Sequence, residues 1–252
     1  MDLKYKNATE AFDNLPSKVM SEADEVETRN GKAYFLPEPL LVTIENPLDR
    51  LIMNTTRDIN PTAVLLETLW VLAGRNDVAF LTKYLKNLAN YSDDGYTWRA
   101  AYGYRWMNHF GKDQLEVAIH RLKTYPEDRR TMISMWDANL DLNKENHFKD
   151  LPCNFMIKPS IRNGKLDMTV YNRSNDIVWG MLNVNIVEFT ILQEYLAARV
   201  GVPVGKYYLF SDNAHVYEMT VDKLKGSKSE EAPVCQPCFQ KPEEFPKEIK
   251  IS

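Results

Sequence analysis

The chain has 252 residues, of which 44% are hydrophobic and 26% are charged, and its formal net charge is −4. These values are typical of a globular protein with a sizeable core, and a chain of this length can form one large domain. The slightly acidic balance argues against a general affinity for nucleic acid, so any phosphate site has to be local. Because no run of about 18 apolar residues is present, a membrane span is not expected.

The start of the chain and its cysteines indicate the compartment. The opening residues lack the apolar core of a signal peptide. With only Cys153, Cys235 and Cys238, a disulfide framework is not expected, and a reducing cytoplasm fits best. Cys235 and Cys238 form a lone CxxC without the second pair of ligands that structural zinc needs, so we expect no metal.

Helical signals dominate the first half of the chain. Pro61 suits a first helical turn and Gly74 suits the residue after a helix, which predicts a helix over residues 61–73. An Asn-Asp cap and helical spacing predict a second helix over residues 78–88. The same spacing predicts a third over residues 115–122.

Strand signals dominate the second half. Residues 155–161 and 166–171 flank Asn163-Gly164, a dipeptide that strongly favours a hairpin turn. Residues 130–136 and 206–210 have the pattern of further strands.

A long helix is predicted over residues 184–200 and ends at Gly201. Its apolar residues cover more than one face, so it should be largely buried. Residues 1–30 are polar and charged without a sustained period, and we treat them as a candidate mobile N-terminal segment. The whole pattern predicts one α+β domain over residues 1–252, with helices covering a sheet.

One proline-backed cysteine, Cys153, lies twenty residues before the pair Arg173-Ser174. A free thiol is only a few per cent thiolate at neutral pH, so it needs nearby cations to act as a nucleophile. Arg173 and the upstream pair Arg129-Arg130 are candidates. Most free cysteines are small buried hydrophobes, and that reading would fit Cys153 taken alone. Its surroundings favour a nucleophile.

Glu67 interrupts an apolar helical run, and two readings are open. It can face solvent on an amphipathic helix. Alternatively, apolar neighbours can raise its pKa into a range suited to proton transfer. The pattern alone favours neither reading.

Six motifs in register resemble those of the thymidylate synthase family, from about Arg29 to Tyr217. Glu67-Thr68-Leu69-Trp70 is similar to the family's helical E-L-L-W, Tyr102-Gly103 with Trp106 to V-Y-G-x-x-W, and Asp128-Arg129-Arg130 to S-R-R. Pro152-Cys153 is similar to P-C-H, Tyr171 through Gly180 to Y-Q-R-S-x-D-x-x-x-G, and His215-Val216-Tyr217 to H-x-Y. The resemblance implies a mixed β-sheet covered by helices around the long buried helix, in a homodimer with a shared active site.

The resemblance also implies a reaction. Cys153 would add to carbon 6 of a pyrimidine nucleoside monophosphate, so that carbon 5 attacks the methylene group of methylenetetrahydrofolate. Glu67 and Tyr102 would organise the water that removes the proton from carbon 5, and Asn154 would stand beside the nucleophile in place of the family's histidine.

Binding roles follow from the same resemblance. The nucleotide phosphate would be held by Ser174 and Arg173, and by the pair Arg129 and Arg130 of the partner subunit. Arg29 matches a further phosphate arginine of the family, but a surface arginine before a turn fits that position equally well. Guanidinium groups suit this role because they bind phosphate oxygens bidentately. His215 and Tyr217 would contact the sugar, and Asp176 and Arg57 the folate.

The base-reading position departs from the family. The family's glutamine is replaced by Asn172, and its asparagine four residues after Gly180 is replaced by Val184. A one-residue insertion would give the role to Asn185. An amide that donates and accepts suits the O4 and N3–H groups of uracil, so we expect a uracil base rather than cytosine.

Further departures concern the product. Leu88 and Tyr91 stand where the family has tryptophans, although Trp98 is near, and the family's C-terminal closing tail is not recognised. Water access decides whether the methylene is reduced or captured by water. We therefore expect a thymidylate synthase that converts dUMP to dTMP, or alternatively a hydroxymethyltransferase acting on dUMP, dCMP or CMP. An inert nucleotide-binding protein or a cysteine hydrolase fits less well.

Overall fold

The computed structural model describes residues 1–28, 30–54, 60–142, 148–224 and 229–230. Arg29, Arg57, Cys235 and Cys238 lie outside these ranges. The strands are β1 (Asp2–Tyr5), β2 (Asp24–Thr28), β3 (Gly31–Phe35), β4 (Leu40–Ile44), β5 (Ile133–Ser134), β6 (Asn154–Arg162), β7 (Lys165–Asp176) and β8 (Val204–Tyr217). The α-helices are α1 (Ala8–Glu22), α2 (Pro61–Leu72), α3 (Val78–Thr82), α4 (Tyr102–Tyr104), α5 (Gln114–Thr124), α6 (Ala138–Asp141), α7 (Ile186–Val200) and α8 (Glu218–Leu224). Other helical segments are the 3₁₀-helix η1 (Lys86–Tyr91) and the π-helices η2 (Arg105–His109) and η3 (Ile177–Asn185).

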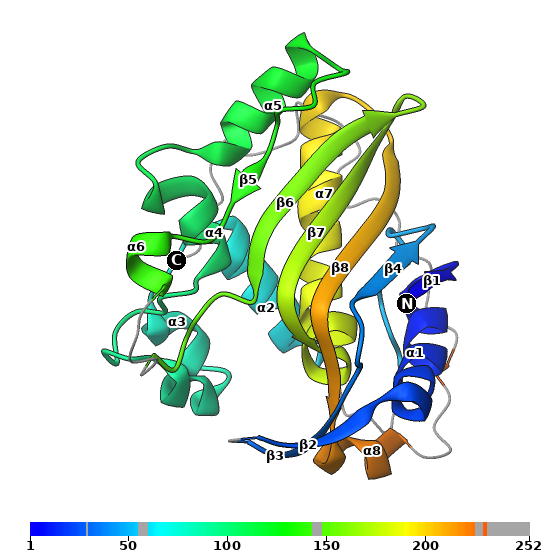
Figure 1. Cartoon of the computed structure of the whole chain (residues 1–252). Coiled ribbons are helices and arrows are strands. Elements are labelled where there is room, and N and C mark those ends of the chain that lie inside the picture. The colour runs from blue at the N-terminus through cyan, green and yellow to red at the C-terminus, as the bar shows by residue number, and fades with distance from the viewer. Residues whose placement is uncertain (29, 55–59, 143–147, 225–228, 231–252) are drawn as a thin grey trace.

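The strands form one mixed sheet in the order β1-β4-β8-β7-β6-β5, with β3 also pairing β8 and β2 (Figure 1). The pairs β1–β4 and β7–β8 are parallel, and the remaining pairs are antiparallel. A parallel pair needs a long crossover, and η3 with α7 supplies it between β7 and β8. The mixed sheet with helices is the α+β arrangement expected.

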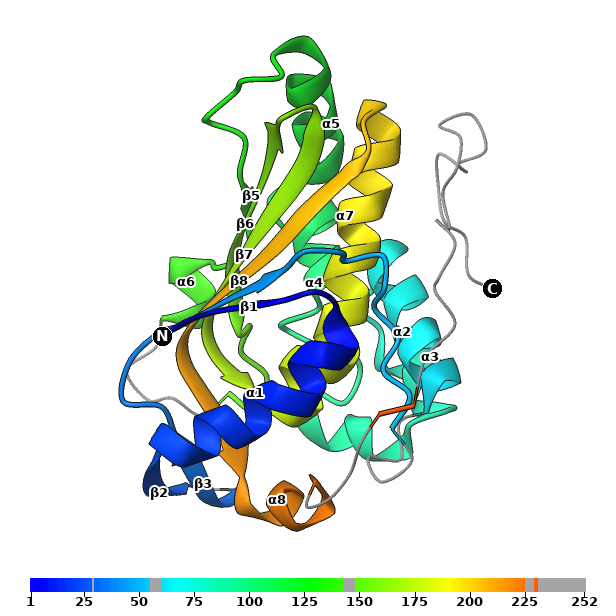
Figure 2. The same cartoon turned by 90° about the vertical axis from the view of Figure 1, so that its right-hand side faces the viewer.

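Figure 2 shows the sheet nearly edge-on, with α7, α2 and α3 on one side of it. In Figure 1 the opposite face of β6, β7 and β8 is turned to the viewer, and no helix of the described residues crosses it. None of the described helices combines the length and the apolar character needed to cross a bilayer.

The long buried helix is confirmed. α7 ends at Gly201, whose φ of 93° is the left-handed geometry that favours glycine. It buries polar as well as apolar side chains, including Glu188, Gln193 and Glu194. The start differs from the expectation, because residues 184 and 185 belong to the π-helix η3.

The hairpin and the first helix are also confirmed. Asn163 and Gly164 have φ values of 50° and 71°, which fit a two-residue turn with both central residues at positive φ. Asn60 caps α2 by accepting a hydrogen bond from the Ala63 N–H, and Pro61 occupies the first turn.

Two predicted elements are shorter than expected. The helix predicted over residues 78–88 ends at Thr82, and η1 follows after an extended Leu85. The predicted strand over residues 130–136 is reduced to β5, which pairs only with Met156 and Ile157.

The N-terminal segment differs most from the expectation of an irregular region. β1 pairs with β4, and α1 begins at an Asn7 cap. The buried residues of α1 do follow helical spacing, although Pro16 and many charged neighbours obscure the period. These buried residues are Ala8, Ala11, Phe12, Leu15, Pro16 and Val19.

Candidate active site

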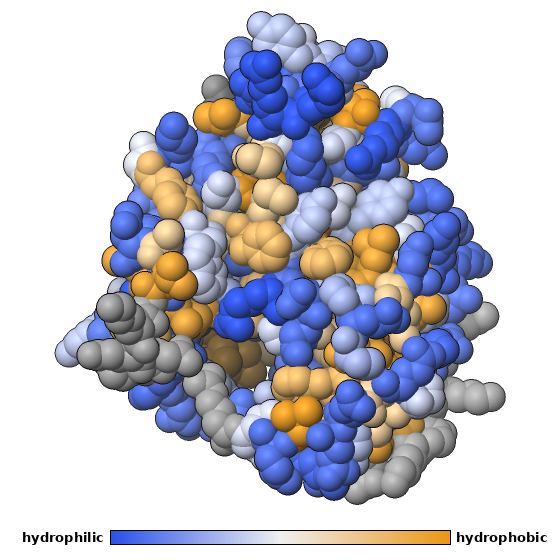
Figure 3. All heavy atoms as spheres, in the orientation of Figure 1, coloured by the Kyte–Doolittle hydropathy of each residue, from blue (hydrophilic) through white to orange (hydrophobic). Residues whose placement is uncertain are grey.

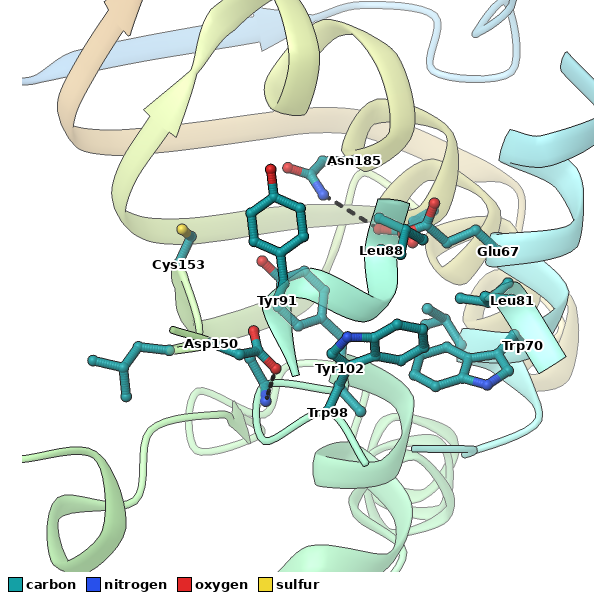
Figure 4. A pocket seen from close by; sticks show the side chains of 15 residues that line it. Glu67, Trp70, Leu81, Leu88, Tyr91, Trp98, Tyr102, Asp150, Cys153 and Asn185 are labelled. Atoms are coloured by element: carbon teal, nitrogen blue, oxygen red, sulfur yellow. Dashed lines mark hydrogen bonds between the residues drawn. The ribbon is translucent and has the colours of Figure 1, made fainter. Parts of the chain in front are cut away.

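A cavity of about 260 Å³ opens beside Cys153. Its walls come from α2, from the segment between α3 and α4, from the residues just before β6, and from the junction of η3 with α7. Figure 3 shows the molecule hollowed between α3 and the strands, with hydrophobic side chains deep in the hollow. Figure 4 shows the side chains that line the cavity.

Arg173 fixes the backbone that carries Cys153. Its backbone N–H donates to the Cys153 carbonyl at 2.9 Å. Its guanidinium donates through Nε to the Pro152 carbonyl at 3.0 Å and through Nη2 to the Leu151 carbonyl at 3.3 Å. The segment that carries Cys153 is therefore held against Arg173 where the start of β6 pairs with the end of β7.

The Cys153 thiol lies in a mixed electrostatic environment. Burial raises its pKa, the Arg173 guanidinium lowers it, and the Asp150 carboxylate raises it. Arg173 itself is exposed. The protein without ligand therefore holds the thiol mainly protonated, with a cation in place to favour the thiolate.

Glu67 faces the cavity rather than bulk solvent, which decides between its two readings. Burial raises the pKa of Glu67 to about 7. Glu188, on α7, lines the same cavity, and burial together with the Glu67 charge raises the pKa of Glu188 well above its usual range. At neutral pH the pair thus holds at least one proton, as a proton-transfer group should.

Tyr102 is placed by a close contact between two helices. A Cβ atom on Gly103 would lie 1.6 Å from the Val71 carbonyl oxygen, so only glycine lets α4 pack this closely against α2. The Tyr102 ring stacks on Phe189 of α7 with centroids 5.7 Å apart. Burial and the Cys153 charge raise the pKa of Tyr102 well above its usual range, so its phenol stays protonated.

Asn185 lines the cavity as well. Its Nδ2 donates to Oε2 of Glu188 at 3.3 Å, which orients the amide (Figure 4). A Cβ atom on Gly180 would lie 3.2 Å from the Asn185 Oδ1, so the glycine leaves room for that oxygen. The expected base reader is therefore in the cavity with a fixed amide.

Asn154 and Asn172 are not brought into the cavity. Both are fully buried, and Asn154 donates through Nδ2 to Oδ1 of Asn172 at 2.9 Å. Asn172 in turn donates to Oδ1 of Asn175 at 2.8 Å. The Asn154 side chain also bonds the Tyr171 carbonyl, at 3.0 Å. These hydrogen bonds join the two strands at the bulge between β6 and β7, although the Asn154 Oδ1 atom is buried without a hydrogen-bond partner.

The sugar and phosphate candidates on β7 and β8 are neighbours. Oδ1 of Asn213 accepts from Ser174 Oγ at 3.3 Å and lies 3.1 Å from Nδ1 of His215. Burial lowers the pKa of His215 to about 4, so its ring is neutral at physiological pH. Asp176 pairs with His215 in the sheet and caps η3, and the Tyr217 hydroxyl accepts from Asn30 at 3.2 Å.

Arg129 and Arg130 do not line the Cys153 cavity. They are exposed in the turn before β5, where Asp128 accepts from the Arg130 N–H at 2.9 Å. Their predicted role in a partner's site stays a prediction. Arg29 and Arg57 lie outside the described residues.

Two carboxyl groups that line the cavity, Asp150 and Glu188, belong to none of the six motifs. Glu188 carries the signal used for Glu67, since it interrupts an apolar helical run. Leu88 and Tyr91, which stand where the family has tryptophans, line the cavity together with the nearby Trp98. Within the described ranges, no cluster of three His, Cys, Asp or Glu residues could hold a metal ion.

Comparison with known proteins agrees with this geometry. The sequence profile of the family described as Thymidylate synthase matches residues 10–244. The chain belongs to the thymidylate synthase family. The family resemblance expected from the six motifs is thereby confirmed.

Relatives of this family carry two different names. The chain is 42% identical over 223 residues to a deoxyuridylate hydroxymethyltransferase of Pseudomonas phage M6, which covers 88% of this chain and 63% of the phage protein. It is 37% identical to another of Bacillus phage SP01, over 90% of this chain and 64% of that protein. A putative thymidylate synthase of Methanothermobacter marburgensis is 30% identical, over 89% of this chain and 96% of the relative. The chain thus spans a little under two thirds of the two phage proteins.

Proposed function

We propose that this protein transfers a one-carbon unit from methylenetetrahydrofolate to carbon 5 of deoxyuridylate and releases a hydroxymethylated nucleotide. The observation that carries the proposal is that Cys153, Glu67, Tyr102 and Asn185 come from four distant segments and line one cavity. Attack at carbon 6 requires a nucleophile, and proton removal at carbon 5 requires a group with a pKa near neutrality, such as Glu67. The oriented amide of Asn185 can hold the base in place for both steps. We assign the activity to a single catalytic domain.

Asn185 supports uracil as the base. One hydrogen of its Nδ2 is donated to Glu188, which leaves the other hydrogen and the Oδ1 atom for a ligand. That donor and acceptor match the O4 and N3–H groups of uracil, whereas cytosine presents the inverted pattern.

The folate is a co-substrate, and the cavity has a surface that fits it. Trp98 packs edge-on against Trp70, with ring centroids 5.3 Å apart, and Leu88 and Tyr91 extend the same wall. Flat apolar side chains of this kind stack on a pteridine ring. Asp176 and Arg57 stay the proposed polar contacts for it.

Two observations favour the hydroxymethyl product. The two phage relatives are both named deoxyuridylate hydroxymethyltransferase. In addition, Tyr91 is 59% exposed, so the cavity wall that it forms borders solvent. Water beside the reacting methylene can add to it before it is reduced.

The second candidate is a plain thymidylate synthase, which the Methanothermobacter relative and the apolar Trp70–Trp98 wall favour.

The phosphate would be held by Arg173 and Ser174 with Arg29, and by Arg129 and Arg130 of a second subunit in a homodimer. On the uncovered sheet face the Tyr171 ring lies between Phe155 and Phe210, with its centroid 6.1 Å from each of theirs. This aromatic row supports that dimer. A cytoplasmic location is proposed with it.

Mass spectrometry of the nucleotide formed from dUMP and methylenetetrahydrofolate tests the proposal. A gain of CH₂O without dihydrofolate is expected. A gain of CH₂ with stoichiometric dihydrofolate would establish the thymidylate synthase instead.

In parallel assays with dCMP, Asn185→Asp should shift the preference toward cytosine, and an unchanged preference would contradict the assignment of Asn185.

A further inference from the structure

Asp150 lines the cavity three residues before Cys153, and the proposed reaction gives it no role so far. Its Oδ2 accepts a hydrogen bond from the Ala100 backbone N–H at 2.9 Å. In Figure 4 its carboxyl group lies beside the Tyr102 ring, on the same side of the cavity as Cys153. The group is therefore held at one oxygen while it borders the cavity.

Neighbouring contacts hold the backbone of Asp150 in place. The Lys149 N–H donates to Oδ1 of Asp93 at 2.9 Å, and the Arg99 guanidinium lies 3.7 Å from the centroid of the Phe148 ring. Both contacts join the residues before β6 to the segment before α4. The position of the carboxyl group is thus built by two segments that both contribute to the cavity wall.

A negative charge on Asp150 disfavours the first step of the reaction, in which the Cys153 thiolate attacks carbon 6. Its charge raises the pKa of Cys153 and also that of Tyr102. A carboxylate at this place therefore disfavours the thiolate that begins catalysis. A role in a later step, when the thiol is already bonded to carbon 6, accounts for its presence without this conflict.

We propose that Asp150 is the general base that deprotonates the water molecule captured by the exocyclic methylene group. The inference rests on the proposed hydroxymethyl product. The oxygen of water bonds to the methylene carbon, and its proton passes to the Asp150 carboxylate. The electron pair of the methylene double bond moves toward O4 and then expels the Cys153 thiolate from carbon 6, which restores the ring double bond. No oxidant or reductant is needed, and the folate leaves as tetrahydrofolate.

The other cavity carboxyl groups suit this step less well. Burial raises the pKa of both Asp150 and Glu188, but the Glu67 charge adds to the shift of Glu188, whose pKa lies well above the usual range, so Glu188 keeps its proton. Glu67 is paired with Glu188 on the side of the cavity that also carries Asn185 (Figure 4). Asp150 lines the same cavity three residues before the nucleophile, and in Figure 4 its carboxyl group lies on the Cys153 side of the cavity rather than beside Glu67.

The test compares Asp150→Asn with Asp24→Asn, an exposed aspartate on β2 far from the cavity. The asparagine keeps an oxygen for the Ala100 N–H and removes the base. We expect Asp150→Asn to form the covalent complex with 5-fluoro-dUMP and methylenetetrahydrofolate as the wild type does. Its rate of hydroxymethyl formation from dUMP should fall by about 100-fold or more, the usual size of a general-base contribution. Added 2-mercaptoethanol should restore turnover as a thioether at the methylene, because a thiol ionises without the base.

A measurement without ligands separates this role from a structural one. The pH profile of Cys153 alkylation by iodoacetamide should move to lower pH in Asp150→Asn, since a charge that raises the thiol pKa is gone. Hydroxymethyl formation within about twofold of the Asp24→Asn rate would overturn the inference, and so would loss of the 5-fluoro-dUMP complex, which would indicate a structural role. If the wild type forms no hydroxymethyl nucleotide, the proposed function fails instead, and that result is distinct.

Discussion

Glu67, which is half-buried, and Glu188, which is fully buried, are carboxyl groups of the cavity whose protonation couples to folding. Burial raises the pKa of Glu67 from 4.5 to about 7. Between these two pH values the folded protein keeps a proton that the unfolded chain has already released. The stability from this proton is therefore full below about 4.5 and is lost as pH rises through about 7. One shifted pKa unit corresponds to about 1.4 kcal/mol.

Urea unfolding across this pH range tests the coupling. We expect the free energy of unfolding to fall with rising pH more steeply in the wild type than in Glu67→Gln, because glutamine cannot ionise. The two slopes should differ by up to about 1.4 kcal/mol per pH unit. Glu45→Gln, at an exposed glutamate, is the matched control and should keep the wild-type slope. Equal slopes for the wild type and Glu67→Gln would show that Glu67 is not buried as described.

Some site residues can be predicted from the sequence because they belong to motifs with fixed order. Cys153 and Arg173 are of this kind, whereas Asn185 reaches its expected role only through a one-residue insertion after Gly180. Asp150 lies outside any motif, and only the backbone contacts of the segment before α4 reveal that it reaches the cavity. Asn154 and Asn172 show the reverse: they occupy motif positions, but their side chains bond to each other inside the sheet.

At the scale of elements, the packing of α4 against α2 places Tyr102. The Cβ atom of Gly103→Ala would lie 1.6 Å from the Val71 carbonyl oxygen, so the helices must separate. Overpacking of this kind costs about 1–3 kcal/mol. We expect Gly103→Ala to lower the melting temperature and also to slow formation of the 5-fluoro-dUMP complex.

Gly111→Ala is a useful comparison for this variant. The added Cβ meets nothing within 4 Å, but the φ of 69° is unfavourable for alanine. A cost of about 1–2 kcal/mol in stability is therefore expected, with normal complex formation. If both variants formed the complex at the wild-type rate, the close packing at Gly103 would not be what positions Tyr102.

Elements with strong local signals can be predicted, and elements defined by distant pairing cannot. The capped helix α2, the β6–β7 hairpin and α7 carry their own end signals. β8 was recognised only over residues 206–210, because its full length depends on pairing with β4, β7 and β3. β1 likewise depends on its parallel partner β4.

At the scale of the whole molecule, the proposed homodimer would account both for the uncovered face of β6, β7 and β8 and for the distance of Arg129 and Arg130 from the cavity. A symmetric dimer through this face would bury the aromatic side chains and carry each arginine pair toward the partner's cavity. Subunit mixing tests this arrangement. Cys153→Ser and the double variant Arg129→Ala, Arg130→Ala should each be inactive alone.

After subunit exchange, half of the dimers are mixed, and each mixed dimer regains one intact site of two. About a quarter of the wild-type activity should therefore return. Native mass spectrometry confirms the exchange. Mixed dimers without activity would show that the arginines act within their own subunit or not at all.

The central claim is that the cavity at Cys153 carries out one-carbon transfer to deoxyuridylate. Peptide mapping of the complex formed with 5-fluoro-dUMP and methylenetetrahydrofolate tests it most directly, because fluorine at carbon 5 cannot leave as a proton does and the covalent intermediate accumulates. We expect one adduct, on the peptide that contains Cys153, and none with Cys153→Ser. An adduct on another residue, or undiminished adduct in Cys153→Ser, would contradict the account.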